Sequence, residues 1–511
     1  MAELASDTML QQFAASREQL SADPYRPVYH YVNPEGNLND PNGLCYWEGQ
    51  YHLFYQAYPP EDPRQHWGHA ISNDLIHWRD LPLAIYPGPE HACFSGSTLV
   101  EEERVIAMYH GTQAGNMVAT SHDPLLLNWE KVTGKEVIAG DRKDGVTVFD
   151  PCIWKRDGMY YSLSGGTLPH GSVDLSEKRL FLHHQRKVAH FLFCSADLKT
   201  WEYLHPFVEG GELFSLLGDD GACPYFWPIG DRHLLLHTSH MSGPKYLIGD
   251  YDTTRDKFVA TSGGRLAFGA GCNPGGMNAP SATPDGKGGV FVIFNLASAR
   301  PGSGWDQIMS LPRRLSLNGR DELAVEPAGD IASLRYDHCH LDALSLPANQ
   351  EVVLAGVAGN AMEIVAEIDP RASPMIEMNV LRSPGKEEFT RIAFYRQRGY
   401  PNWDRFTGWE PRQWLEACDS LFMVDSSNSS ELPDVLSRAP EIAPVYLKPD
   451  EPLQLRLFID KSIVEVFVNG RQCISLRVYP GRSDSVGVSL RAQGSDVLMH
   501  SLDAWQMKSI Y

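Results

Sequence analysis

The sequence predicts an all-β protein in which a five-bladed β-propeller is followed by a C-terminal β-sandwich. Three observations carry this prediction. Short strands with alternating apolar and polar residues dominate the chain, and one turn motif recurs along its first half. After "SLPRRLSL" at 310–317 the residue pattern of the strands and of the turns between them changes.

The strands are short runs in which apolar and polar residues alternate, such as "YHLFYQAY" (51–58), "RVIAMYHGT" (104–112) and "RHLLLHTSH" (232–240). Turns built from Gly, Pro, Asn and Asp separate them, for example "GKGG" at 286–289, which we interpret as a hairpin turn. This pattern is typical of antiparallel sheets. Long helical periodicity is absent beyond the first twenty residues, so the fold class is all-β.

One phrase, a Ser/Asp turn followed by an aromatic residue that closes a strand, recurs along the chain. It reads "SNDLIHW" (72–78), "SHDPLLLNW" (121–129) and "SADLKTW" (195–201), with a degenerate fourth copy in "DYDTTRDKF" (250–258). Recurrence every 50 to 75 residues suits four-stranded units arranged radially. A sandwich can repeat a turn by accident, so it stands as the alternative to a propeller.

From about residue 340 the turns that end in an aromatic residue no longer occur. The strands there show a simple alternation of apolar and polar residues, as in "VEVFVNG" (464–470) and "SVGVSLRA" (485–492). That pattern favours a β-sandwich. We therefore expect a propeller at 25–335 and a sandwich at 345–511. The polar stretch at 397–447, rich in Pro, Ser and Asn, is interpreted as an insertion loop on the sandwich.

Composition limits the partners and the compartment. The formal net charge is −20 over 511 residues, which argues against nucleic acid or an anionic membrane as a partner and favours a neutral small molecule. The nine cysteines are scattered without a CxxC pair, so we expect reduced thiols and neither a metal site nor a cofactor. No signal peptide and no membrane-length apolar run is visible, and we expect a cytoplasmic protein.

Two Asp-Pro pairs begin strands in different repeats. Asp40 lies in "GNLNDPNGLCYW" (36–47) and Asp150 in "TVFDPCIWK" (147–155). Each alone is typical of an ordinary Asx-Pro turn. The innermost strands of a propeller begin near the central axis, however, so these two carboxylates can converge on one pocket. Paired carboxylates with aromatic walls indicate glycoside chemistry.

Other chemistries fit less well. "FSGST" (94–98) lacks the glycine spacing of a serine nucleophile elbow. His183, His184 and His190 lie in the basic stretch "KRLFLHHQRKVAH" without a metal-binding motif, and we interpret that stretch as a solvated edge.

The motifs resemble glycoside hydrolase family 32, the invertase, inulinase and levanase group that acts on β-fructosides. The resemblance is carried in order by "NDPNG" (39–43), "HWGHAISNDLIHW" (66–78), "FSGST" (94–98), "FDP" (149–151) and "LRLFIDKSIVEVFVNG" (455–470). It implies that Asp40 is the nucleophile and that Asp150 steadies the oxocarbenium-like transition state. It also implies a fructose pocket lined by Asn39, Gln56, Trp67, Phe94 and Ser95.

Two positions depart from the family pattern. Phe149 stands where the family has Arg before the second Asp. In "GDDGACPYFW" (218–227), Ala222 stands where the Glu-Cys-Pro motif has its proton donor. A methyl group cannot donate a proton, so a strict mapping predicts turnover lower by roughly 100- to 10,000-fold.

Three explanations of Ala222 are open. Asp220 lies two residues earlier, on the same face of an extended strand, and can substitute as the acid, with Asp219 as the weaker candidate. Ala222 can instead be an introduced replacement of a glutamate, or the protein can bind fructosides without hydrolysing them. We expect retaining hydrolysis of terminal β-fructofuranosyl bonds, with carboxyls roughly 5–5.5 Å apart, and keep a silent fructoside-binding protein and a fructosyltransferase as alternatives.

Overall fold

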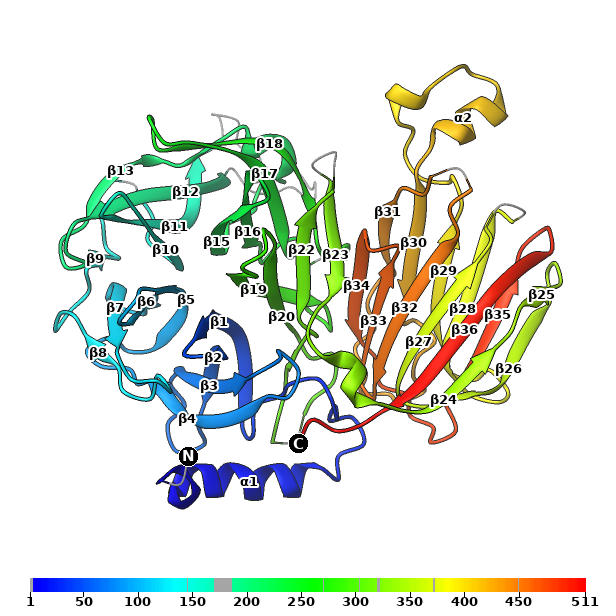
Figure 1. The fold of residues 1–511 in the computed structure, drawn as a ribbon, viewed down its shortest axis with the longest axis horizontal. Coiled ribbons are helices and arrows are strands. Elements are labelled where there is room, and N and C mark those ends of the chain that lie inside the picture. Colours follow the sequence, from blue (N-terminus) through cyan, green and yellow to red (C-terminus); the bar gives the residue numbers. More distant parts are fainter. Residues whose placement is uncertain are drawn as a thin grey trace.

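The chain folds into two β-domains, a propeller and a sandwich, packed side by side (Figure 1). This computed structural model describes residues 3–144, 146–169, 186–269, 271–302, 304–318, 322–370, 373–448 and 450–511. Within them, five antiparallel sheets surround a central axis and two larger sheets stack beside them. The predicted fold class, a five-bladed propeller followed by a sandwich, is confirmed.

The five blades follow one another along the chain, each with its first strand innermost except where a short outer strand precedes it. Blade one comprises β1 (Asn37–Trp47), β2 (Gln50–Tyr58), β3 (His66–Ser72) and β4 (Arg79–Ile85). Blade two comprises β5 (Cys93–Val100), β6 (Val105–Gly111), β7 (Gly115–Ser121), β8 (Glu130–Lys131) and β9 (Ile138–Ala139). Blade three comprises β10 (Pro151–Arg156), β11 (Met159–Pro169), β12 (Arg186–Ser195) and β13 (Glu202–Pro206).

Blades four and five complete the ring. Blade four comprises β14 (Val208–Glu209), β15 (Ala222–Ile229), β16 (Arg232–Thr238), β17 (Lys245–Asp252) and β18 (Lys257–Arg265), with β14 parallel to β18 at the outer edge. Blade five comprises β19 (Met277–Pro284), β20 (Val290–Leu296), β21 (Ile308–Met309), β22 (Arg313–Leu317) and β23 (Leu323–Pro327). The "GKGG" segment is the turn between β19 and β20, as predicted.

The recurring turn phrase is the connection between the third and fourth strands of a blade. In each copy one Asp carboxylate caps the turn. Asp74 accepts the backbone NH groups of 76 and 77, Asp123 those of 125, 127 and 128, and Asp197 those of 199 and 200. In the degenerate copy Asp252 does the same for 254 and 255. The repeat seen in the sequence is therefore an Asx-type turn that joins two outer strands in four of the five blades.

The sandwich consists of two antiparallel sheets. One contains β24 (Arg335–Leu341), β25 (Leu344–Leu346), β36 (Val497–Met507), β27 (Ala361–Ile368), β32 (Leu453–Asp460), β33 (Ile463–Val468) and β34 (Gln472–Arg477). The other contains β26 (Glu351–Ala358), β35 (Gly487–Ala492), β28 (Met375–Arg382), β29 (Thr390–Tyr395), β30 (Ser420–Asp425) and β31 (Glu441–Val445). A continuous apolar core lies between them.

Helices are few. They are η1 (Glu3–Ser6), α1 (Thr8–Leu20), η2 (Gly211–Phe214), η3 (Ile331–Leu334), η4 (Trp403–Arg405) and α2 (Pro411–Ala417). Among the described residues no helix has the length and apolar character that a membrane span needs. The prediction of a plain loop at 397–447 is wrong, because the segment contains η4, α2, β30 and β31. Within this segment α2 projects from the end of the sandwich (Figure 1).

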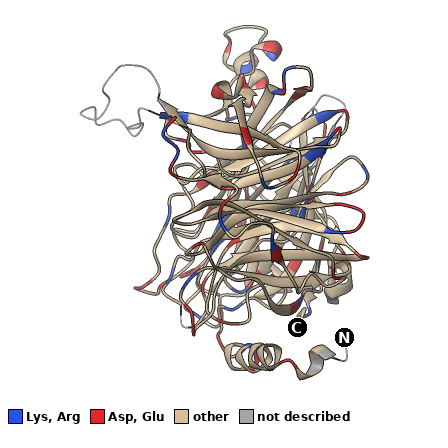
Figure 2. Ribbon diagram, turned by 90° about the vertical axis from the view of Figure 1, so that its left-hand side faces the viewer, with Lys and Arg blue, Asp and Glu red and all other residues tan. Residues whose placement is uncertain are grey.

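A buried ionic network joins the two domains. His30, just before β1, contacts Asp460 through Nδ1 at 2.9 Å and Glu465 through Nε2 at 3.1 Å. Glu465 also accepts a hydrogen bond of 2.9 Å from Arg313 of the propeller. On the outside, Lys and Arg are interspersed with Asp and Glu over both domains in the view of Figure 2.

Candidate active site

The innermost strands of all five blades bring one polar side chain each to the centre of the propeller. Asp40 lies on β1, Ser95 on β5, Asp150 immediately before β10, Cys223 on β15 and Asn278 on β19. The predicted convergence of the two Asp-Pro starts is what the structure shows. Because the strands pair outward within their own blades, their inner ends are free to present side chains to one shared site.

Asp40 is half-buried, and neutral hydrogen-bond donors contact both of its carboxylate oxygens. Its Oδ2 accepts from Ser95 Oγ at 2.7 Å and from Gln56 Nε2 at 3.4 Å. Its Oδ1 accepts from Asn278 Nδ2 at 3.3 Å and from Asn295 Nδ2 at 3.5 Å. Burial raises the pKa of the Asp40 carboxyl, and the Ser95 hydroxyl works against that shift. These donors fix the position of the carboxylate, and within the described part of the chain no cationic side chain forms a salt bridge with it.

Cys223 links the two carboxylates. Its backbone NH donates to Asp150 Oδ2 at 3.1 Å, and its thiol lies 3.4 Å from that oxygen and 3.6 Å from Asp40 Oδ2. A register shift between Ala222 and Tyr225 turns this NH and thiol toward the centre. Burial raises the pKa of the Cys223 thiol well above its ordinary value and also raises that of Asp150, so the sulfur keeps its proton between two acids.

The remaining predicted residues form the floor and one wall of the site. Asn39 Oδ1 accepts from Gln307 Nε2 at 3.1 Å. Trp67 is fully buried and donates its indole NH to the carbonyl of Phe94 at 2.9 Å, so it lies behind the wall and holds Phe94 in place. Phe94 and Phe149 are both exposed, and each ring contacts that of His110.

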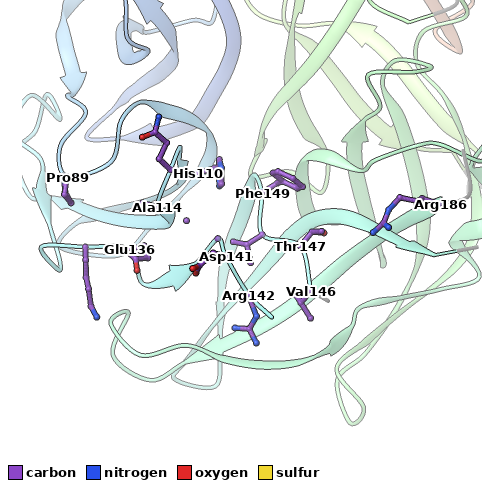
Figure 3. A pocket seen from close by; sticks show the side chains of 15 residues that line it. Pro89, His110, Ala114, Glu136, Asp141, Arg142, Val146, Thr147, Phe149 and Arg186 are labelled. Carbon is purple, nitrogen blue, oxygen red and sulfur yellow. The ribbon is translucent and has the colours of Figure 1, made fainter. Parts of the chain in front are cut away.

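A cavity of about 880 Å³ opens beside this wall, between the second and third blades. Figure 3 shows its side chains coming from both blades, among them His110 and Phe149. Phe149 directly precedes Asp150 in the chain, and the charge of His110 acts on the Asp150 carboxyl. Asp40 and Asp150 do not line it. Basic and acidic side chains alternate around it, namely Lys135, Glu136, Asp141, Arg142 and Arg186.

In the stretch 218–227, where Ala222 stands at the position of the family's glutamate, the two aspartates have different surroundings. Asp219 is fully buried, accepts from Ser242 Oγ at 2.6 Å and lies 3.5 Å from Lys245 Nζ, so it is a structural residue. Asp220 lies at the rim, where its Oδ2 is 2.5 Å from His240 Nδ1. Ala222 is buried at the start of β15 and contributes only a methyl group.

Several residues of the site were not predicted. No sequence motif marks Asn278 or Asn295 as a site residue. They lie near the ends of β19 and β20, the two innermost strands of blade five, where a propeller places residues close to its axis. His240 lies in the plain stretch after β16. The interpretation of His190 as part of a solvated edge is wrong, because its side chain is buried on β12, where burial lowers its pKa to about 3. His183 and His184 lie outside the described residues.

Comparison with protein families finds two matches that together span most of the chain. The model described as "Glycosyl hydrolases family 32 N-terminal domain" matches residues 30–327, and that described as "Glycosyl hydrolases family 32 C terminal" matches residues 331–506.

Individual relatives agree. A levanase of Bacillus subtilis is 29% identical over 96% of this chain and 71% of that protein. A fructan 6-exohydrolase of Beta vulgaris is 27% identical over 95% of this chain and 87% of that protein. The crystal structure of a fructan 1-exohydrolase IIa variant from Cichorium intybus in complex with 1-kestose has a TM-score of 0.79 at 23% identity, covering 95% of this chain and 98% of that one. This last likeness shows the shared fold.

Proposed function

The chain belongs to glycoside hydrolase family 32, and from that premise we propose that it hydrolyses terminal β-D-fructofuranosyl bonds of sucrose, fructo-oligosaccharides or fructans with retention of configuration. The observation that carries the proposal is the pair of half-buried carboxylates, Asp40 and Asp150, which both lie within hydrogen-bonding distance of the Cys223 thiol at the centre of the propeller. The substrates named for the levanase and fructan exohydrolase relatives support the choice of sugar.

Asp40 is the nucleophile of the proposed reaction. Its oxygen bonds to the anomeric carbon of fructose as the glycosidic oxygen leaves, and water later breaks the ester. The ring of amide and hydroxyl donors fixes the carboxylate without cancelling its charge, because all of them are neutral. Asp150 places a second negative charge beside the site, which stabilises positive charge developing on the sugar ring.

The cavity beside Phe149 supports substrates longer than a disaccharide. It adjoins the carboxylate site through His110 and Phe149, and its volume of about 880 Å³ lies in the range of pockets that enclose whole ligands. Its mixed polar lining offers donors and acceptors to sugar hydroxyl groups. We assign it to the units that follow the scissile bond.

The test is release of reducing sugar from sucrose and 1-kestose, with the anomeric form of the first product followed by NMR. Asp40→Asn is expected to abolish release, while acid-quenched wild-type protein is expected to carry one fructosyl residue on Asp40 by mass spectrometry. Ala222 favours a second candidate, a fructoside-binding protein. Tight 1-kestose binding with no release and no adduct would establish that function instead.

We also propose that the protein works in a reducing compartment, the cytoplasm. All nine cysteines are free thiols, and the one at the site, Cys223, makes its contacts to the carboxylates as a protonated thiol. Cell fractionation with the reducing-sugar assay tests this location.

A further inference from the structure

A hydrogen-bonded pair, Asp220 and His240, lies at the rim of the site, at the same end of the β15–β16 hairpin as Ala222. Asp220 Oδ2 lies 2.5 Å from His240 Nδ1, and Asp220 Oδ1 accepts the backbone NH of His240 at 3.3 Å. Both carboxylate oxygens are thus engaged by one residue. Asp220 therefore faces the histidine, and its position is set by that contact.

The pairing of β15 with β16 explains why these two residues meet. Ala222, the first residue of β15, pairs with Thr238, the last residue of β16. Asp220 lies two residues before the first and His240 two residues after the second, so the chain ends leave the sheet side by side. The imidazole is held at the end of the innermost hairpin of blade four, where the carboxylate site lies.

Two short connections tie this hairpin end to the carboxylates. Thr238 Oγ1 lies 3.5 Å from Asn278 Oδ1, and the amide of Asn278 donates to Asp40. On the other strand, the backbone NH of Cys223 donates to Asp150. The hairpin end that carries the pair is therefore hydrogen-bonded to Asp150 directly and to Asp40 through Asn278.

The imidazole is charged in this setting. The titratable groups that act on His240 are Asp220 before β15, Asp40 on β1 and Asp150 before β10. The hydrogen bond with Asp220 is the largest influence, and with the attraction of the three carboxylates it outweighs partial burial and raises the pKa of His240 to about 9. Its side chain is 67% exposed, and among the described residues no group bonds to Nε2.

The geometry points to His240 as the catalytic proton donor of this chain, with Asp220 as the positioning residue that binds Nδ1 and leaves Nε2–H for the substrate. This inference rests on the proposed function. When the glycosidic bond breaks, Nε2–H gives its proton to the leaving oxygen while Asp40 bonds to the anomeric carbon. Neutral Nε2 then takes a proton from the attacking water as the bond to Asp40 breaks.

The experiment compares two substrates that differ in their need for an acid. 1-Kestose loses an alkoxide that must be protonated, whereas β-D-fructofuranosyl fluoride releases fluoride without a proton. His240→Gln is expected to lower kcat on 1-kestose by roughly 100- to 10,000-fold and to leave the first-turnover release of fluoride within a few-fold of wild type. His77→Gln is the matched control, because His77 Nδ1 lies 2.7 Å from Asp74 Oδ2 far from the site.

The pH dependence of kcat/KM distinguishes a proton donor from a residue that only supports the fold, because a purely structural role of His240 would not shift it. In the wild type, kcat/KM on 1-kestose is expected to fall as the pH rises through about 9, where His240 loses its proton. Asp220→Asn removes the largest cause of the raised pKa, so this alkaline limb is expected to move to lower pH while some activity persists.

Each opposite result overturns the inference. His240→Gln with 1-kestose turnover equal to the control shows that the imidazole donates no proton. An equal loss on both substrates shows that it only supports the fold. Loss of activity in Asp220→Asn with normal His240→Gln makes Asp220 the acid. A wild-type protein that releases no fluoride and forms no adduct on Asp40 refutes the proposed function itself, independently of His240.

Discussion

The contact between propeller and sandwich is expected to weaken at alkaline pH through one residue, His30. Its ring is fully buried at the interface, with Asp460 on one nitrogen and Glu465 on the other. Asp460 also accepts the backbone NH groups of residues 28, 29 and 30, so the segment that leads into β1 is held on this carboxylate. Deprotonation of His30 removes the positive charge from the centre of this arrangement.

The size of the effect follows from the pKa. Burial alone lowers the pKa of His30, but the hydrogen bonds with Asp460 and Glu465 outweigh it and raise the value from 6.5 to about 9. A folded-state pKa above the unfolded one stabilises the protein fully below pH 6.5, and that stability is lost as the pH rises through 9. At 1.36 kcal/mol per pKa unit the loss is ~3 kcal/mol.

Thermal unfolding of the whole chain at pH 6 and pH 9.5 measures it, with His30→Gln as the comparison. The wild type is expected to lose ~3 kcal/mol more than the variant across this range, a difference of a few degrees in Tm. Other titrating groups affect both chains alike and cancel in the comparison. Equal pH responses of the two chains would refute the assignment of the interface charge to His30.

Three further predictions concern the framework of the site. Asp219→Asn leaves the buried ammonium of Lys245 without its carboxylate and is expected to cost roughly 3–5 kcal/mol, measured as a fall in Tm. Gly96→Ala is expected to lower both Tm and kcat, because an added Cβ would lie 2.1 Å from a backbone oxygen of β6. Gly134→Ala is the control and should behave as wild type, because a Cβ at Gly134 meets no atom within 4 Å. Replacement of residues 403–416 by an Asn-Gly turn is expected to leave kcat and Tm nearly unchanged, since a backbone hydrogen bond of 2.9 Å already joins Asn402 and Ala417. A large loss would show that this projection supports the site.

Turn chemistry made the fold predictable from the sequence. A carboxylate that caps a turn leaves a local pattern, and Asp74, Asp123, Asp197 and Asp252 repeat it in the first four blades. Asp40 and Asp150 were predictable for a related reason, because an Asp-Pro pair at the start of an inner strand is also a local signal.

His240 was not predictable in the same way. Its contact with Asp220 depends on which residues of β15 and β16 pair, and a register shift within that hairpin moves the pairing by one position. Register is a long-range property that the local sequence does not carry. The same holds for Asn278 and Asn295, whose amides reach Asp40 from another blade. Residues that meet across strands far apart in the chain become visible as a site only in the folded protein.

The two departures from the family pattern are connected through this histidine. Phe149 removes a cation beside Asp150, and Ala222 removes an acid. The imidazolium of His240 supplies a positive charge that acts on both carboxylates and a proton that can be transferred. His240 therefore supplies both the positive charge and the acid that the family pattern places elsewhere. We expect a chain with Phe149 and Ala222 to need this histidine for activity.

This dependence makes Ala222→Glu a sharp test. A carboxyl introduced at position 222 lies at the same hairpin end as the His240 imidazolium. It is expected to be held ionised, because an opposite charge lowers the pKa of an acid, and an ionised carboxyl cannot donate a proton. Ala222→Glu alone is therefore expected to change kcat on 1-kestose by less than about tenfold, whereas in the His240→Gln background the same substitution is expected to restore at least 100-fold of the lost activity, the scale of general acid catalysis. A large gain from Ala222→Glu in the wild-type background would show instead that the pocket is built around a glutamate and that His240 takes no part in proton transfer.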